Sequence, residues 1–115
     1  MKLLDQIQIL TRPYARKGAK ENRRQQIRRM EAFGAYCAAL GAVDMGQVGG
    51  RHVVGYWKAL RASGGLAPKT LNSHRLAIAI LWELSGKIGE PPRPFPSEKV
   101  ERLARAQKQA FEGRG

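Results

Sequence analysis

The segment from Leu66 to Trp82, LAPKTLNSHRLAIAILW, constrains the fold more strongly than any other part of this chain. Pro68 suits the first turn of a helix, because its missing N–H has no partner to lose there. Apolar residues then recur at the spacing of one helix face: Leu71, Ile78, Leu81 and Trp82. The segment therefore predicts an amphipathic helix over residues 68–85 whose C-terminal half is buried in a core.

Other segments of the chain show the same helical period, and glycine or proline separates them. They predict helices near residues 20–40, 50–62 and 97–111, with a short additional helix from Leu3 to Leu10. No strand-like alternation of apolar and polar residues appears. The sequence therefore predicts an all-α bundle of four to five helices. Its predicted core consists of Phe33, Cys37, Leu40, Val53, Trp57, Leu60, Leu71, Ile78, Leu81 and Trp82.

The length of 115 residues predicts one folding domain with a core large enough for independent folding. We expect three parts along the chain. Residues 1–19 form an N-terminal segment and basic arm, and residues 20–90 form the helical domain. Residues 91–115 contain a proline-rich connector, which no helix crosses, and a C-terminal helix with an apolar face.

The charge of the chain is far from balanced. Twenty-one Lys and Arg residues against nine Asp and Glu give a net charge of +12 and a pI near 10.7. A polyanionic partner is the leading physical explanation, through phosphate contacts and counterion release. No apolar run approaches the roughly 20 residues that span a bilayer, and the N-terminal segment does not resemble a signal peptide. We therefore expect a cytoplasmic, nucleoid-associated protein with no membrane partner.

The positive charge is concentrated before and within the first long helix. Between positions 11 and 29 the chain has eight basic residues and only one acidic residue, Glu21. They are Arg12, Arg16, Lys17, Lys20, Arg23, Arg24, Arg28 and Arg29. We expect an arm around Pro13 and Gly18, followed by the helix. The chain has no acidic residue between Asp44 and Glu83, so the next two helices add positive charge to the same protein.

The cysteine, histidine and tryptophan residues, which in other proteins often form active or binding sites, are expected to have structural roles in this chain. Cys37 lies on an apolar stripe, so we expect a buried thiol and not a nucleophile. His52 and His74 lack the companions that a metal site needs. Trp57 and Trp82 lie on apolar faces and are expected to anchor the core. The sequence therefore predicts no metal, no cofactor and no catalytic group.

A set of motifs appears in a fixed order along residues 20–92. A long helix after a basic entry is followed by the Val53–Leu60 motif V..YW..L, then by Lys69-Thr70-Leu71-Asn72 opening the third helix, and finally by Ile88-Gly89-Glu90-Pro91. This order resembles the N-terminal SAM-like, or core-binding, domain of tyrosine recombinases and phage integrases. The resemblance implies a SAM-like helical bundle that binds double-stranded DNA.

The same resemblance implies which residues contact the DNA. In the family, the domain clamps one face of a duplex, and its first and third helices approach the major groove. Carried over by position, the DNA-binding residues are Arg23, Arg24 and Arg28, with Lys69, Thr70, Asn72, Ser73 and His74. We add to this set Arg75 and the basic residues that precede or begin the first helix, Arg16, Lys17 and Lys20. The family usually has an apolar residue at the position that Arg75 occupies here. Either Arg75 reaches outward from the apolar stripe, or the helix is rotated.

The catalytic half of these recombinases carries a His-x-x-Arg pair and a nucleophilic tyrosine. Neither histidine of this chain begins such a motif, and its three tyrosines have no activating neighbours in sequence. We therefore expect a non-enzymatic, sequence-specific or structure-guided DNA-binding protein. It is either the core-binding domain of a site-specific recombinase or integrase, or a stand-alone DNA-binding protein of a mobile element.

Two other functions fit the same helices. A helical protein–protein interaction module is the main alternative, because SAM-like bundles also serve that role. The C-terminal helix could then mediate self-association or bind a recombinase partner. RNA binding is less favoured, since the sequence lacks exposed aromatic clusters. The salt dependence of binding distinguishes DNA binding from protein interaction, because phosphate binding weakens steeply with salt and an apolar interface does not.

Overall fold

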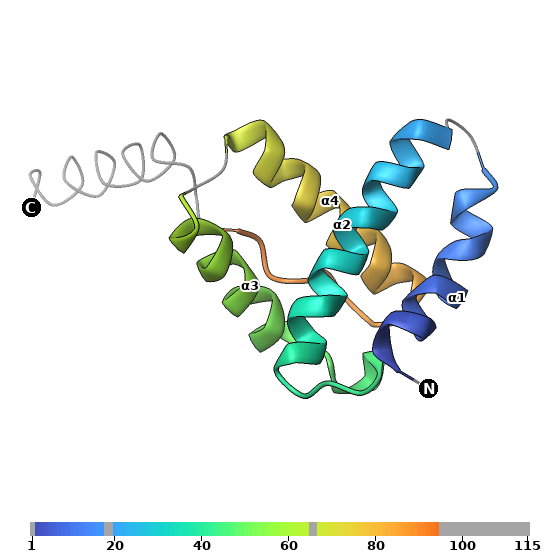
Figure 1. Cartoon of the computed structure of the whole chain (residues 1–115), viewed down its shortest axis with the longest axis horizontal. Helices are drawn as coiled ribbons and strands as arrows, with labels where there is room; N and C mark the ends of the chain where they lie inside the picture. Colours follow the sequence, from blue (N-terminus) through green and yellow to red (C-terminus); the bar gives the residue numbers. More distant parts are fainter. Residues whose placement is uncertain (1, 18–19, 65–66, 95–115) are drawn as a thin grey trace, which may run out of the picture.

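A computed structural model describes residues 2–17, 20–64 and 67–94 of the chain, and Figure 1 shows their arrangement. The helices are α1 (Leu3–Ala15), α2 (Lys20–Ala39), α3 (Gly50–Ala62) and α4 (Pro68–Leu84), with a short 3-10 helix, η1 (Met45–Gln47). No strand occurs within these ranges, so the predicted all-α fold is confirmed. The predicted C-terminal helix at 97–111 lies outside the described residues.

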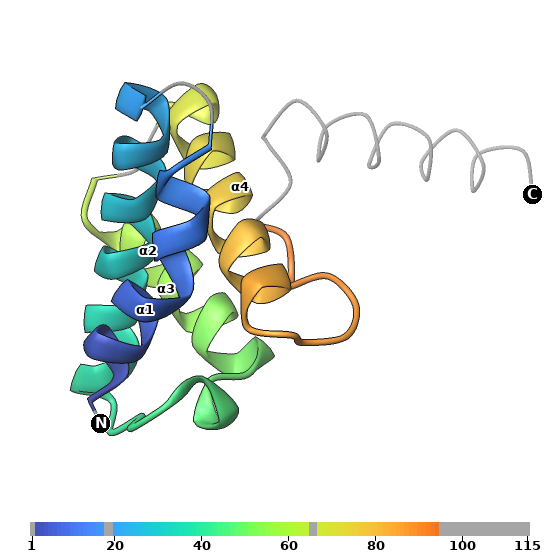
Figure 2. The same cartoon turned by 90° about the vertical axis from the view of Figure 1, so that its right-hand side faces the viewer.

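Helices α1 and α2 form an antiparallel pair that runs the length of the bundle (Figures 1 and 2). A side chain at Gly34 of α2 would overlap Ile7 of α1, so glycine lets the two helices approach closely. At the other end of the pair, the guanidinium of Arg23 donates to the carbonyl oxygen of Tyr14 over 2.9 Å. The same guanidinium lies 4.3 Å from the centre of the Tyr14 ring, where cation–π attraction adds to the contact.

The prediction of an arm around Pro13 is wrong for residues 11–15, because α1 continues through them to Ala15. Pro13 removes one helical hydrogen bond, which in a helix interior costs about 3 kcal/mol. The buried face of α1 outweighs this cost. Leu3 and Ile7 are buried at helical spacing, and Thr11 follows on the same face with its hydroxyl donating to Ile7 O over 2.9 Å. Residues 3–15 therefore share the core with the rest of the bundle.

The core contains most of the residues that the sequence pattern indicated. Seven predicted members are buried: Phe33, Cys37, Val53, Trp57, Ile78, Leu81 and Trp82. Leu60 and Leu71 are half-buried and pack against this cluster. Leu40 is the error, since its side chain is 61% exposed. Helix α2 ends at Ala39, and Gly41 turns the chain with a φ of 98°, which carries Leu40 away from the core.

Hydrogen bonds to side chains fix the chain between α2 and α3. The side chain of Asp44 accepts a hydrogen bond from Gln47 N over 3.2 Å at the start of η1. The side chain of Gln6 in α1 accepts one from Met45 N over 2.7 Å, which ties η1 to the first helix. At the start of α3, His52 Nδ1 accepts from Gly49 N over 3.1 Å. His52 therefore caps a helix.

After α4, the connector of residues 85–94 turns back toward α3 and runs between α3 and α4 (Figure 1). Trp57 Nε1 donates to Pro92 O over 2.9 Å, and Pro91 is buried. A side chain at Gly50 would approach Pro92 Cγ to 3.3 Å, so glycine makes room for the connector at the start of α3. Trp57 is thus both a core residue and the anchor of the connector.

Candidate nucleic-acid interface

Basic residues lie near three helix ends of the bundle. Arg16 and Lys17 follow α1, Lys20 begins α2, and Lys69 is the second residue of α4. The end of α1 and the start of α2 adjoin at the upper right of Figure 1, whereas the start of α4 lies apart from them at the upper left. We call the region formed by the end of α1 and the start of α2 the basic end, where the partial positive charge of the α2 N-terminus adds to the cations.

Several of these cations are exposed and have no carboxylate partner. Arg16 and Lys17 are exposed at the basic end, Arg24 and Arg28 are exposed on α2, and Lys69 is exposed at the start of α4. The ion pair between Glu90 and Arg93 lies on the connector and involves none of these five residues. Cations without internal partners are free to contact phosphates without first breaking an ion pair.

Arg23 makes a contact within the protein. Its guanidinium is held by the Tyr14 ring and carbonyl, and its side chain is half-buried. Arg23 therefore joins α1 to α2, and its DNA contact stays a prediction. Arg29 is also engaged internally, because its Nη1 donates to Gln26 Oε1 over 2.9 Å.

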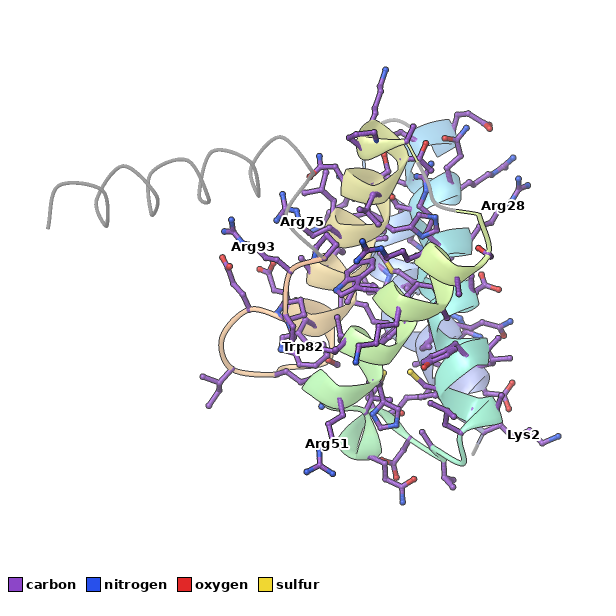
Figure 3. The ribbon with its side chains drawn as sticks, turned by 90° about the vertical axis from the view of Figure 1, so that its left-hand side faces the viewer. Lys2, Arg28, Arg51, Arg75, Trp82 and Arg93 are labelled. Atoms are coloured by element: carbon purple, nitrogen blue, oxygen red, sulfur yellow. The ribbon has the colours of Figure 1, made fainter. Side chains whose placement is uncertain are left out.

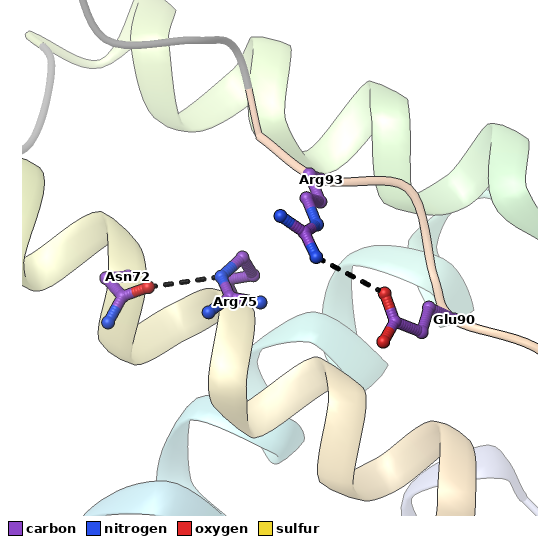
Figure 4. Close-up of polar contacts among 4 residues, drawn as sticks. All are labelled: Asn72, Arg75, Glu90 and Arg93. Carbon is purple, nitrogen blue, oxygen red and sulfur yellow. Dashed lines mark hydrogen bonds and ion pairs between the residues drawn. The ribbon is translucent and has the colours of Figure 1, made fainter.

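The first two turns of α4 present fewer outward side chains than predicted. Lys69, Thr70 and Asn72 are exposed. Ser73 is half-buried, and its hydroxyl donates to Lys69 O over 3.2 Å. The side-chain oxygen of Asn72 accepts from Arg75 Nε over 3.1 Å (Figure 4). The helix start therefore offers Lys69, Thr70 and the amide nitrogen of Asn72 to a partner.

His74 points its Nδ1 edge into the protein. Its ring centroid lies 6.2 Å from that of Tyr56 on α3, and Nδ1 is buried without a hydrogen-bond partner among the described residues. Burial, and then the charge of Arg29, lower the pKa of His74 below its usual value of 6.5. His74 thus packs between α3 and α4, and the DNA contact that the resemblance implied stays a prediction.

This environment predicts a stability loss in acid. The folded state holds His74 neutral to a lower pH than the unfolded chain does, so the unfolded chain binds more protons as the pH falls below about 6.5. The contribution is fully present above that pH and is lost as the pH falls toward the lowered pKa. We expect urea midpoints at about pH 7.5 and about pH 5.5 to differ less for His74→Leu than for the wild type. An equal difference in both proteins would contradict this assignment.

Arg75 resolves the alternative that the sequence left open. The apolar stripe of α4 buries Ile78, Leu81 and Trp82 as predicted, so the helix is not rotated. Arg75 is half-buried beside this stripe and reaches outward. Figure 3 shows Arg28 on one side of the bundle and Arg75 with Arg93 on the other. The predicted DNA-binding residues therefore form two surfaces, not one.

The tyrosines and the cysteine have packing roles. The Tyr56 ring contacts Phe33 and Tyr36, each with centroids 5.3 Å apart. Burial raises the pKa of the Cys37 thiol to about 12, which disfavours the thiolate that a nucleophile requires. Arg93 lies on the same side of the bundle as Arg75 (Figure 3), and the sequence analysis did not include it among the candidate residues. It lies among prolines in a segment without helical period, so no pattern related it to α4.

Within residues 2–17, 20–64 and 67–94, no three His, Cys, Asp or Glu side chains are grouped so that they could hold a metal ion. None of the described helices combines the length and apolar content needed to cross a membrane. Comparison with known proteins gave no match to this chain among family models, curated proteins or solved structures.

Proposed function

We propose that this protein binds double-stranded DNA without catalysing a reaction on it. The observation that supports this most is the set of exposed cations without carboxylate partners at the basic end, on α2 and at the start of α4: Arg16, Lys17, Arg24, Arg28 and Lys69. The resemblance to core-binding domains makes a site-specific recombinase or integrase, or another protein of a mobile element, the proposed setting. In a cell, such a protein would associate with the nucleoid.

Helix α2 supplies the main phosphate contacts in this proposal. Arg24 and Arg28 are four residues apart, so they lie one turn apart on the same face of the helix. The planar guanidinium donates two parallel hydrogen bonds to a phosphate, which fixes the orientation of the backbone. A duplex on this face also lies near the positive charge of the basic end.

The start of α4 supplies the candidate contacts to bases. An asparagine amide can bond adenine and a lysine can bond guanine in the major groove. Asn72 and Lys69 occupy the first turns of α4 and are exposed. Because Asn72 also holds Arg75, its contribution to sequence preference would be smaller than that of an unengaged asparagine.

A gel-shift titration with random and palindromic duplexes tests the proposal. We expect binding to random duplex with a Kd on the order of 1–100 µM at physiological salt, and tighter binding to a preferred sequence. A folded protein that shifts neither duplex at low salt would contradict DNA binding. Equal affinity for every sequence would retain DNA binding and remove the base contacts of α4.

One observation favours a second candidate, a protein-interaction module. Leu40 and Val43 are 61% and 55% exposed, and both lie in the turn between α2 and η1. Neighbouring exposed apolar side chains are typical of protein contacts. A complex through this turn would keep its affinity in high salt, whereas the DNA complex would not.

A further inference from the structure

We propose that Arg75 and Arg93, with Asn72, form a second phosphate-binding surface on the side of α4 away from α2, so that one chain can hold two duplex segments. This inference rests on the proposed DNA binding and extends it. It makes the protein a DNA-bridging module whose α2 face holds one segment and whose α4 face holds the other.

The two arginines face the same space although they are far apart in sequence. Figure 4 shows Arg75 on α4 and Arg93 on the connector directed into one region, with α2 behind them. Asn72 Oδ1 accepts from Arg75 Nε over 3.1 Å, which orients the guanidinium. No described residue accepts a hydrogen bond from the two terminal nitrogens of Arg75. These nitrogens are the donors that a phosphate would use.

Arg93 has a weak internal partner. Its Nη2 lies 3.6 Å from Glu90 Oε2, and the two side chains are 72% and 78% exposed. Ion pairs this exposed contribute little to stability, so a phosphate could take the place of Glu90 at small cost. Two guanidinium groups that face one space repel each other in the free protein. A bound phosphate would relieve that repulsion by lying between them.

The connector that carries Arg93 is fixed to the core. Trp57 Nε1 donates to Pro92 O over 2.9 Å, immediately before Arg93 in the chain. Pro91 is buried, and Pro92 lies against the start of α3 at Gly50. Because the hydrogen bond from Trp57 and the packing of the two prolines already hold this backbone, it loses little conformational freedom when Arg93 binds a ligand, which favours affinity.

One duplex cannot contact both surfaces. Arg28 and Arg75 lie on opposite sides of the bundle (Figure 3), separated by the thickness of two packed helices, on the order of 20 Å. Each lies more than about 10 Å along its helix from the start of that helix, at 1.5 Å per residue. A duplex is straight over so short a length, since its persistence length is about 150 bp. Contact with both sides therefore requires two segments.

Capture of one duplex by another tests the inference directly. A biotinylated random duplex is held on beads, the full chain is added, and retention of a fluorescent duplex of different sequence is measured. We expect the wild type to retain the second duplex. Arg75→Ala with Arg93→Ala should reduce retention by about tenfold or more, while affinity for a single duplex changes by less than about threefold.

A charge-matched control removes two cations elsewhere. Lys2 and Arg51 lie at the opposite end of the bundle (Figure 3), and Lys2→Ala with Arg51→Ala should leave retention nearly unchanged. Arg93→Ala alone, which changes no helix, should weaken retention partly. The inference is wrong if the wild type binds single duplex without retaining a second one. It is also wrong if the Arg75/Arg93 variant retains as much as the wild type, because bridging would then come from a pair of chains. If the wild type does not bind even a single duplex, the proposed function itself is contradicted.

Discussion

Replacing Phe33 by alanine is expected to lower the free energy of unfolding by about 3–5 kcal/mol. Phe33 is fully buried on α2, and its ring packs edge-on against Tyr56 of α3 with centroids 5.3 Å apart. Truncation removes this contact and leaves a cavity between the two helices. The free energy of unfolding of a small domain is about 5–15 kcal/mol in total, so this loss would be a large part of its stability.

The matched control is Leu40, which the sequence pattern places on the same apolar stripe. Leu40 is 61% exposed, so Leu40→Ala should change the free energy of unfolding by less than about 0.5 kcal/mol. Urea unfolding followed by tryptophan fluorescence measures both variants, because Trp57 and Trp82 are buried in the core. Similar losses at the two positions would mean that α2 continues past Ala39 and buries Leu40.

Reversing two charges on α2 is expected to produce the largest effect on DNA affinity. Arg24→Glu with Arg28→Glu replaces two exposed cations with anions on the face proposed to hold phosphates. We expect the Kd for random duplex to rise by about a hundredfold or more at low salt, since both attractions become repulsions. Fluorescence anisotropy with a labelled duplex measures the change.

The control for charge reversal again uses the far end of the bundle. Lys2→Glu with Arg51→Glu changes the net charge by the same amount at residues that Figure 3 places away from Arg28. This variant should lose less than about tenfold in affinity, through the general field of the protein. Equal losses in the two variants would indicate binding through net charge alone, without a defined surface on α2.

Helix positions were predictable because local patterns determine them. Pro68 begins α4, Gly41 follows the end of α2, and the buried stripe of α4 at Ile78, Leu81 and Trp82 has helical spacing. In α1 the tertiary contacts of Ile7 outweigh the helix-breaking effect of Pro13. The spacing of apolar residues in the sequence does not show which of these two effects is larger. For this reason the predicted arm and the true helix differ.

The composition of the site was predictable in part, but its division into two surfaces was not. The basic residues at the end of α1, on α2 and at the start of α4 could be identified from their density and from the resemblance. That Arg23 is engaged by Tyr14, or that Arg93 lies near Arg75, depends on how the helices and connector pack. Such contacts join residues from different elements, so no periodicity reveals them.

The dependence of duplex affinity on salt tests the proposed DNA binding most directly. Five exposed cations at the basic end, on α2 and at the start of α4, each releasing about 0.9 counterion, predict that log K falls with log salt with a slope of about −4 to −5. Arg24→Ala with Arg28→Ala should make the slope less steep by about 1.8. A wild-type slope near zero, or a slope unchanged by removing these two arginines, would contradict the account.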